Sequence, residues 1–522
     1  MGNVCPHANA MRPSAHAHRL AILRLAPRPP AVGSLRIPPH GRIRRHHGLC
    51  PWGSIAWACG ASAWLCGLQL SVAADQPPWP SVQLTPEDRI LILAPHPDDE
   101  VLGCGGIIQR AMAMHLPLRL VFFTYGDNNQ WSFLVYRKRL VLGAVAVQGM
   151  GLVRHDEGVA AAQVLGLSPD HLTFLGYPDF GTLEIWKSHW GDRPPLRGML
   201  TRVVAVPYAN ALRPGAAYKG EEIVGDLMAV LRDFRPTKIF LSHPGDHMPD
   251  HAALYLFTRV ALWTMGSELE PKLYPYLIHF KGWPWPHGFR PDESLEPPSL
   301  FRDDAAWHSL ALVPEEVERK HAAIQAHRTQ YASSARYLRL FMRANELFGD
   351  FPPVALGRSV PAVALSAGRK PSATEAPEEL TDAERAAFVG LETRAIQLDG
   401  DQLVVSIGFS RSLGQAVSAS VYAFGYRADR PFAQMPKLHI KVGTIHHAVY
   451  DQRRRIPEGA LRVSHRPRQL TIRIPLAMLG NPEKILTSAQ TSLGQIPLDT
   501  VSWRVLELPH RQAGVPLTEK VH

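Results

Sequence analysis

The sequence predicts an α/β protein with a Rossmann-like, doubly wound, mainly parallel sheet, followed by a C-terminal all-β sandwich domain. Short apolar runs alternate with longer helical patterns between about residues 90 and 263, which is typical of βαβ units around a parallel sheet. Beyond a segment rich in Pro, Ala, Ser and Gly, the hydrophobic period changes to two. At 522 residues the chain is also long enough for two folded domains.

The first domain, expected at residues 85–350, contains four apolar runs that read as buried strands, each followed by a helical pattern. The expected strands are 90–94, 118–124, 172–175 and 238–242, and the expected helices are 101–114, 155–166, 221–235 and 249–263. A further helical stretch, 314–348, closes the domain. Sheets of this kind bind ligands at the carboxyl ends of their strands, so we expect the functional site there.

The second domain is expected at residues 385–511, after a linker with little structure at 351–384. Its β-prone runs are 403–409, 418–426, 438–442, 470–474 and 501–508. Several short strands separated by turn residues predict a β-sandwich, and an appended module of this type suggests carbohydrate binding. Whether it binds a glycan is left open by the sequence.

Residues 1–74 have the composition of a leader. They contain no Asp or Glu and eight arginines, which account for most of the formal net charge of +10. A basic stretch, an apolar stretch at 54–70 and the small residues 72–74 follow one another in the order of a secretory signal. We expect cleavage after Ala74 and a periplasmic or extracellular protein. An uncleaved membrane anchor, an organelle transit peptide and a twin-arginine signal are the alternatives.

The distribution of charge and cysteine narrows the possible partners. Basic residues concentrate in the leader and no basic stripe interleaved with aromatics follows it, so we expect no nucleic-acid partner. We also expect no stable membrane span after cleavage. Only Cys104 lies outside the leader, so a cleaved chain has no internal disulfide. The oligomeric state is not determined by these features.

Two clusters of metal-binding residue types follow the first and fourth predicted strands. The first cluster reads Pro-His-Pro-Asp-Asp-Glu at 95–100, and the second reads Ser-His-Pro-Gly-Asp-His-Met-Pro-Asp-His at 242–251. Both clusters open a helix, so they occupy equivalent positions at one edge of the sheet. His and carboxylate ligands suit Zn²⁺, and a catalytic zinc ion takes three protein ligands and leaves one position for water. The first cluster can supply two ligands and a base, and the second can supply the third ligand.

The motif His-Pro-Asp-Asp-Glu at 96–100, followed by Gly-Cys-Gly-Gly at 103–106 and a later Asp-His…Asp-His segment, resembles the PIG-L/LmbE family. This family consists of zinc-dependent de-N-acetylases that act on N-acetylglucosaminyl substrates. The resemblance covers roughly residues 86–348. It implies hydrolysis of an N-acetyl amide on an amino sugar in a glycan, glycoside or glycolipid, with release of acetate and a free amine.

Position by position, the resemblance implies that His96, Asp99 and His251 bind zinc. It implies that Asp98 is the general base and that His247 assists the tetrahedral intermediate and the leaving amine. A catalytic zinc ion lowers the pKa of a bound water toward about 7 and polarises the amide carbonyl. Fe²⁺ is the alternative metal, because it can occupy similar N/O sites.

One departure from the family concerns His247. The family commonly has His-Pro-Asp-His, whereas this chain has one more residue, Met248, between His247 and the Pro-Asp-His that follows. His243 is therefore an alternative to His247 in assisting catalysis.

Six further residues are expected to support the ligands or contact the substrate: Glu100, Arg154, Asp179, Asp246, Asp250 and His279. Glu100 also suits a helix N-terminus for its charge alone, and Asp250 suits either a helix cap or an orienting hydrogen bond to a ligand histidine. Arg154 and Asp179 are expected in loops. The resemblance implies that they contact sugar hydroxyls, and the alternative is a surface ion pair or a turn residue. His279 lines the cleft or packs in the core, and Cys104 is interpreted as a packing residue.

Two other functions remain compatible with the sequence. One is an amidase acting on another N-acyl metabolite. The other is a non-catalytic, exported glycan-binding protein that keeps the metal only as a structural element, although such a scaffold has no need of the base Asp98.

Overall fold

The computed structural model describes residues 79–128, 143–357, 360–365, 380–457 and 459–509, all of which belong to one compact unit of the chain, 73–522. The predicted leader and its cleavage site after Ala74 lie outside these residues. In the described ranges, none of the helices has the length and apolar character needed to cross a bilayer.

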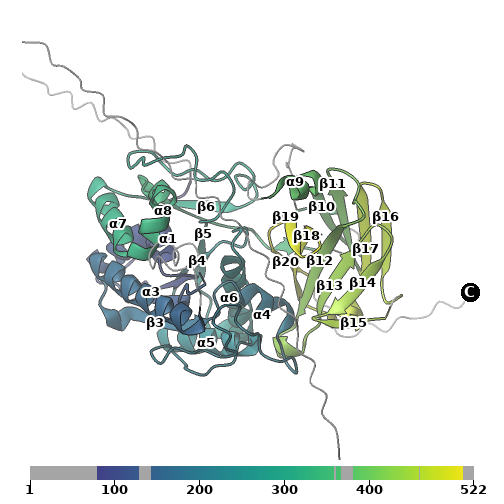
Figure 1. Ribbon diagram of the computed structural model, residues 1–522, viewed down its shortest axis with the longest axis horizontal. Coiled ribbons are helices and arrows are strands. Elements are labelled where there is room, and N and C mark those ends of the chain that lie inside the picture. The colour runs from purple at the N-terminus through teal and green to yellow at the C-terminus, as the bar shows by residue number, and fades with distance from the viewer. Residues whose placement is uncertain (1–78, 129–142, 358–359, 366–379, 458, 510–522) are drawn as a thin grey trace, which may run out of the picture. The chain divides into compact units, whose positions relative to one another are not determined.

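A seven-stranded sheet, in the order β3-β2-β1-β4-β5-β7-β6, forms the centre of the N-terminal part (Figure 1). Its strands are β1 (Ile90–Ala94), β2 (Leu118–Thr124), β3 (Leu172–Tyr177), β4 (Lys238–Ser242), β5 (Lys272–Tyr276), β6 (Ala306–Ala311) and β7 (Asn345–Asp350). Strands β1 to β5 pair in parallel, and β7 pairs antiparallel with both β5 and β6. The chain leaves β1 first toward β2 and later returns to β4 on the other side. The two predicted metal-binding clusters therefore follow the two strands that flank the switch point of the sheet, where ligands bind.

Helices lie on both sides of this sheet (Figure 1). They are α1 (Asp99–Ala113), α3 (Ala144–Val164), α4 (Thr182–Ser188), α5 (Gly220–Phe234), α6 (Pro249–Met265), α7 (Pro314–Ala326) and α8 (Arg328–Leu338), with short 3₁₀ turns η1 (Pro169–His171), η2 (Gly266–Glu268) and η3 (Arg339–Phe341). Helix α7 packs against α1 and α3, and α6 packs against α4 and α5. All five residues of β1 are buried, and β1 has the bounds that the sequence predicts. Helix α6 begins at the predicted residue because Pro249 suits the first position of a helix.

The predicted elements of the N-terminal part were wrong or incomplete in several places, and α4 and β6 were not predicted at all. Helix α3 begins at Ala144, eleven residues before the expected start, so Arg154 lies inside a helix. The stretch 314–348 contains α7 and α8, but its end belongs to β7, which is buried between β5 and β6. Strand β5 was missed because it contains Pro275, and a proline argues against a central strand. The structure accommodates it because the pairing of β5 with β7 is confined to Tyr276.

The C-terminal part is an all-β region with two sheets. One sheet has the order β16-β17-β11-β10-β9, and the other has the order β15-β14-β13-β12-β18-β20-β8, with β19 paired to β18. The strands are β8 (Val354–Ala355), β9 (Val363–Ala364), β10 (Leu391–Asp399), β11 (Gln402–Phe409), β12 (Val417–Tyr426), β13 (Lys437–Val442), β14 (His447–Asp451), β15 (Arg454–Ile456), β16 (Arg462–Arg466), β17 (Gln469–Pro475), β18 (Lys484–Leu493), β19 (Ile496–Thr500) and β20 (Arg504–Glu507), with α9 (Asp382–Ala387), η4 (Phe432–Gln434) and η5 (Leu476–Leu479). Residues of both sheets form one buried apolar cluster. An α/β sheet followed by an all-β region confirms the predicted fold class.

The described residues of the interval 351–384, which the sequence predicts to be a linker with little structure, include two short strands. Strand β8 pairs with β20, and β9 pairs with β10. Leu356 and Leu380 are buried in the apolar cluster of the all-β region. Residues 366–379 and the last two residues of the predicted domain lie outside the described ranges. The interval therefore contributes to the β sheets, which its Pro- and Ala-rich composition concealed.

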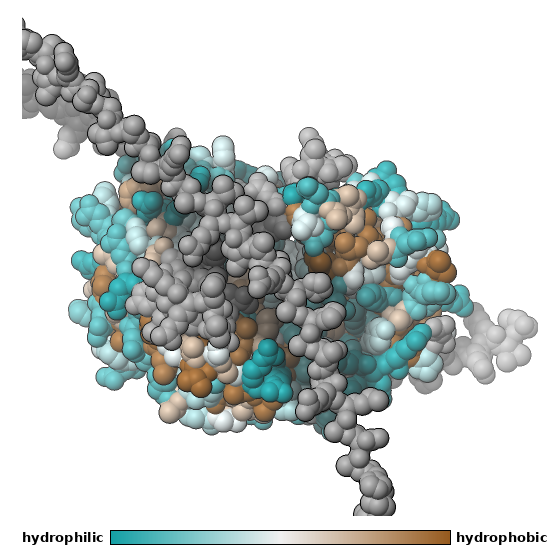
Figure 2. Space-filling model, viewed as in Figure 1, coloured by the Kyte–Doolittle hydropathy of each residue, from teal (hydrophilic) through white to brown (hydrophobic). Residues whose placement is uncertain are grey.

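The apolar residues of the described chain gather in two buried clusters. The larger cluster contains the strands and inner helix faces of the N-terminal part, together with aromatic residues of the all-β region such as Phe424, Phe432 and Trp503. On the face drawn in Figure 2, hydrophilic residues surround smaller groups of hydrophobic ones. The two parts of the unit thus share one of their two cores.

Candidate active site

The turn between β1 and α1 holds a residue in an unusual backbone conformation. Asp98, which precedes the first residue of α1, has φ 136° and ψ −30°, a region that residues with a Cβ rarely adopt. The Asp98 N–H donates to Glu100 Oε2 at 2.9 Å, and its carbonyl accepts from the N–H groups of Val101 and Leu102, both at 3.1 Å. Such strain persists only where the surroundings fix it, and it is concentrated at functional sites.

Glycines in the first turns of α1 let the helix approach the sheet and its neighbours. A Cβ on Gly103 would meet the Tyr276 ring at 2.5 Å, and one on Gly106 would meet Leu312 at 2.3 Å. Beneath this helix, Glu346 accepts hydrogen bonds from the N–H of Gly106 at 2.7 Å and from Lys320 Nζ at 2.6 Å. These contacts hold the first turn of α1, and with it the acidic motif, against the end of the sheet. Cys104 is fully buried here, as expected of a packing residue.

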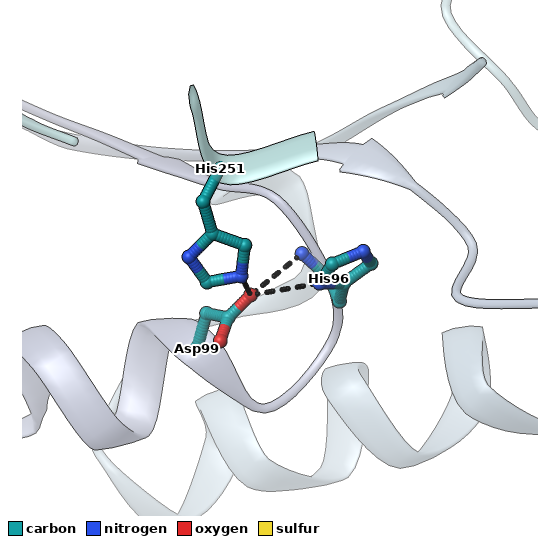
Figure 3. Close-up of side chains that lie close together, drawn as sticks. All are labelled: His96, Asp99 and His251. Carbon is teal, nitrogen blue, oxygen red and sulfur yellow. Dashed lines mark hydrogen bonds and ion pairs between the residues drawn. The ribbon is translucent and has the colours of Figure 1, made fainter. Parts of the chain in front are cut away.

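Three of the predicted residues meet at this edge (Figure 3). His96 Nδ1 and His251 Nε2 each lie 3.1 Å from the same oxygen, Oδ2 of Asp99. All three side chains are buried, and the two imidazole rings are 5.3 Å apart between centroids. The group comes from the turn after β1, the first residue of α1 and the first turn of α6. Its ligand atoms are close enough to one another to hold a metal ion.

A carboxylate also lies beside the other nitrogen of each histidine. His96 Nε2 is 3.1 Å from Asp179 Oδ1 and 3.2 Å from Asp250 Oδ2, and His251 Nδ1 is 3.0 Å from Asp246 Oδ2. A metal-binding histidine usually donates its second ring N–H to a carboxylate, which fixes the tautomer and the ring orientation. The arrangement therefore leaves His96 Nδ1 and His251 Nε2 as the nitrogens that face a shared cation.

His96, Asp179 and Asp250 form a second group whose atoms could hold a metal. The oxygens of Asp250, however, already accept hydrogen bonds from the N–H of Phe180 at 2.6 Å, the N–H of Thr182 at 3.1 Å and the Thr182 hydroxyl at 2.5 Å. In contrast, Oδ2 of Asp99 faces a ring nitrogen of both His96 and His251, while the other nitrogen of His251 is turned toward Asp246. The group of His96, Asp99 and His251 thus fits a cation better.

The charges of the cluster also favour a cation. Although burial opposes it, the Asp246 and Asp99 carboxylates raise the pKa of His251 to about 10. Burial raises the pKa of Asp98 to about 7, although the nearby Arg154 opposes this shift. A group that titrates near neutral pH is well suited to accept and return a proton. Asp98 is thus chemically distinct from Asp99, whose pKa the two histidines hold well below its usual range despite burial.

Comparison with known proteins identifies this part of the chain. Residues 91–262 match the family model described as PIG-L: GlcNAc-PI de-N-acetylase. The chain contains a PIG-L family domain. The matched residues run from β1 into α6, so they include both halves of the cluster drawn in Figure 3.

Relatives of the PIG-L domain carry the name of a sugar deacetylase. The chain is 28% identical over 257 residues to a 1D-myo-inositol 2-acetamido-2-deoxy-alpha-D-glucopyranoside deacetylase of Mycobacterium sp. (strain KMS), which covers 47% of this chain and 75% of the relative. A protein of the same name from Rhodococcus jostii (strain RHA1) is 25% identical over 276 residues, which covers 47% of this chain and 82% of the relative. About half of this chain lies outside each of these alignments.

Solved structures resemble the chain more distantly. The N,N'-diacetylchitobiose deacetylase from Pyrococcus horikoshii is 18% identical, with a TM-score of 0.29 over 50% of this chain and 82% of its own. The A40926 pseudoaglycone deacetylase Dbv21 is 17% identical, with a TM-score of 0.32 over 50% of this chain and 96% of its own. With TM-scores this low, these structures add nothing to the family assignment.

His243 and His247, the two candidate histidines that follow β4, do not belong to the group of His96, Asp99 and His251. His247 is exposed, and its ring lies 4.8 Å from that of Phe280. His243 is buried beside the rings of Trp307 and Phe351, and burial lowers its pKa to about 3. His243 therefore packs in an aromatic pocket and is no substitute at the cluster.

His279 lies beside His251, one of the residues predicted to bind the metal. Its ring lies 4.8 Å from that of His251, edge to face, and its Nδ1 is 3.1 Å from the hydroxyl of Tyr337. Burial lowers the pKa of His279 to about 4. Of the two possibilities that the sequence left open for this residue, the structure places it at the cluster.

Arg154 and Asp179 lie inside the PIG-L domain and not on its surface. Arg154 is 3% exposed and donates from Nη1 to the Gly126 carbonyl and from Nη2 to the Pro97 carbonyl, both at 2.7 Å. It thereby joins the turn after β2 to the turn after β1, with Nη2 3.5 Å from Asp98 Oδ1. Asp179 accepts from the N–H of Asn128 at 2.8 Å while its other oxygen faces His96. A surface ion pair is thus the wrong interpretation for both residues.

Some residues that support the cluster were missed from the sequence. His327, between α7 and α8, places Nε2 2.7 Å from Glu100 Oε1, so Glu100 is a buried partner and more than a helix-end charge. No local pattern indicates His327, since its partner is 227 positions away. Asp127 and Asn128 follow β2 and lie beside Asp179. Asp127 and Asn128 could have been predicted in the same way as the two metal-binding clusters, because they are polar residues that follow a buried strand.

Proposed function

We propose that the chain is a metal-dependent hydrolase that removes the acetyl group from an N-acetylated amino sugar and releases acetate and a free amine. The observation that carries this proposal is the convergence of His96, Asp99 and His251, with Asp98 beside them, in a PIG-L family domain. The names of the relatives support a 2-acetamido sugar as the substrate.

Zinc is the metal that we propose for the cluster. His96 Nδ1, Asp99 Oδ2 and His251 Nε2 would hold it, which is the three-ligand set of two histidines and one carboxylate typical of catalytic zinc. The ion supplies Lewis acidity, which polarises a carbonyl and lowers the pKa of a bound water. The buried donor set of nitrogen and oxygen atoms also suits Fe²⁺, so a metal analysis of the purified protein decides between the two ions.

Asp98 is the proposed proton acceptor. Its side chain is 14% exposed, whereas that of Asp99 is 2% exposed, so Asp98 is the more accessible of the two carboxylates. Its Oδ1 faces Arg154, which orients the carboxylate from the side opposite the solvent. The proton that Asp98 takes from water can then pass to the leaving nitrogen. His279 and His247 are the two histidines proposed to assist at that step, the first because it touches His251 and the second on family resemblance.

The leader and the all-β region extend this proposal to an exported enzyme. We propose that residues 1–74 direct the chain out of the cytoplasm and that its substrate is an N-acetylhexosamine unit of a surface glycan or glycolipid. The order of basic, apolar and small residues in the leader supports export.

An acetate-release assay on the full, zinc-loaded chain tests the activity. Substrates are N,N'-diacetylchitobiose and glycosides of N-acetylglucosamine, with N-acetyl amino acids as non-sugar amides. Asp98→Asn should lose at least about 100-fold in kcat while zinc remains bound, because proton transfer by a positioned group contributes about 10²–10⁴-fold. The matched control is Asp156→Asn, whose side chain is 81% exposed and lies outside the cluster.

Release from the sugars that depends on Asp98 supports the proposal. Release from the non-sugar amides alone would replace it with a general amidase. An absence of release from every substrate by the zinc-bound chain would leave only a binding or structural role for the metal.

A further inference from the structure

Helix α4 (Thr182–Ser188) touches the metal cluster with its first residue. The hydroxyl and the N–H of Thr182 both donate to Oδ1 of Asp250, at 2.5 and 3.1 Å. Asp250 in turn lies 3.2 Å from Nε2 of His96. The position of α4 therefore decides whether Oδ1 of Asp250, the carboxylate beside a predicted metal ligand, keeps its two hydrogen-bond donors.

The other end of α4 packs on the all-β region. The ring of Trp186, which is fully buried, stacks on that of Phe432 at 5.2 Å and lies 5.6 Å from Phe424 and 6.2 Å from Trp503. These four aromatic side chains belong to the larger of the two apolar clusters. Aromatic residues of this size dominate the energetics of the interfaces that they fill.

Polar contacts follow the same junction. The N–H of Trp190, two residues after the end of α4, donates to Oε1 of Gln452 at 3.0 Å, and Glu184 pairs with Arg453 at 2.8 Å. Lys437 is buried with its Nζ 4.7 Å from the centre of the Trp190 ring and 4.3 Å from that of Phe432. The all-β region thus contacts α4 and Trp190 through both apolar and polar groups.

A helix of seven residues has no stability of its own in water, so tertiary contacts must determine where α4 lies. On one side those contacts come from α6, and on the other they come from the all-β region. We propose that the all-β region acts as a brace for the metal site, with Phe432 as a positioning residue that acts on His96 through Trp186, Thr182 and Asp250. This inference rests on the metal site of the proposed function and deepens it.

Zinc affinity of the full chain, measured by competition with a chelator, tests the brace. Removal of an outer hydrogen-bond partner of a metal ligand costs about 10–100-fold in affinity. Phe432→Leu, which only loosens α4, should therefore weaken zinc binding by about 2–10-fold. The matched control is Ile472→Val, a fully buried change on β17 in the other apolar cluster. Phe432→Met, which keeps more of the volume, replaces Phe432→Leu if that variant does not fold.

The route is tested by repeating Phe432→Leu in a Thr182→Val background. The proposal predicts that the effect on zinc affinity is smaller there, because α4 no longer donates a hydroxyl to Asp250 and only the N–H of residue 182 still links them. The proposal is overturned if Phe432→Leu binds zinc as tightly as the wild type, or if Ile472→Val loses as much zinc affinity as Phe432→Leu. It is also overturned if Phe432→Leu weakens zinc binding as much in the Thr182→Val background as it does alone. Zinc binding without acetate release in the wild type would refute the proposed function alone, since the affinity measurement needs no substrate.

Discussion

Replacing Asp246 by Asn tests how much the outer carboxylates contribute to the metal site. Oδ2 of Asp246 lies 3.0 Å from Nδ1 of His251 and accepts from the N–H groups of Ile278 at 3.0 Å and His279 at 2.9 Å. An asparagine keeps the shape, but one of its two atoms becomes a donor and the negative charge is lost. His251 then loses either its carboxylate partner or its fixed orientation.

The expected result of Asp246→Asn is a zinc affinity about 10–100-fold weaker, which is about 1.4–2.8 kcal/mol. Chelator competition on the full chain at constant pH measures the affinity, and urea unfolding of the metal-free chain measures the stability in parallel. Asp233→Asn is the matched control, because that carboxylate is 69% exposed and pairs with Arg119 far from the cluster.

A folded Asp246→Asn variant with the affinity of the wild type would refute the reasoning. It would mean that Asp246 does not orient His251, and that the assignment of Nε2 as the metal-facing nitrogen is wrong. A loss of affinity in Asp233→Asn would point instead to a general effect of net charge.

Three further predictions concern stability. Lys320→Met should cost about 3–5 kcal/mol in urea unfolding, because it leaves the buried carboxylate below α1 without its cation; a loss below about 1 kcal/mol would contradict this. Gly103→Ala should lower the free energy of unfolding by about 1–3 kcal/mol, because its Cβ meets the Tyr276 ring. Gly225→Ala, on an exposed turn of α5 with open space around it, should raise it by about 0.4–1 kcal/mol. Equal effects of the two variants in thermal unfolding would refute the packing argument. Burial lowers the pKa of Lys437 to about 7. Since the unfolded chain holds this proton up to a pH of about 10.4, the unfolding free energy should rise with pH from about 7 to about 10. Lys437→Met should remove that part of the rise, and an identical pH profile in the variant would contradict the prediction.

The sequence was most informative where a buried strand determines the position of the residues that follow it. β1 is an uninterrupted apolar run and β4 has an apolar centre, so their ends, and the motifs attached to them, could be placed at one edge of the sheet from the sequence. Strand β5 and the strands β8 and β9 lack such runs, because Pro275 or a Pro- and Ala-rich composition hides the pairing. Their positions depend on partners that are distant in the sequence.

Some residues that support the site could be predicted from the sequence motifs, whereas others are brought to it only by tertiary packing. Asp246 and Asp250 belong to the second motif and could be named from it, and the structure places both beside histidines that are predicted to bind the metal. Arg154 was named, but its helix began earlier than the pattern indicated, so its burial was missed. His327 contacts Glu100 and Thr182 contacts Asp250 only because of tertiary packing, so their local sequence does not predict these contacts.

The extra residue in the second motif, Met248, separates His247 from the helix that carries His251. Helix α6 begins at Pro249, which places Asp250 and His251 in its first turn, where both face the cluster. Met248 stands between His247 and that proline, and the N–H of Met248 is held by Oδ1 of Asp246 at 2.9 Å. His247 therefore lies before the helix, with its N–H donating to the His279 carbonyl at 2.8 Å and its ring on Phe280. The backbone of His247 thus holds that of His279, whose ring lies 4.8 Å from the ring of His251.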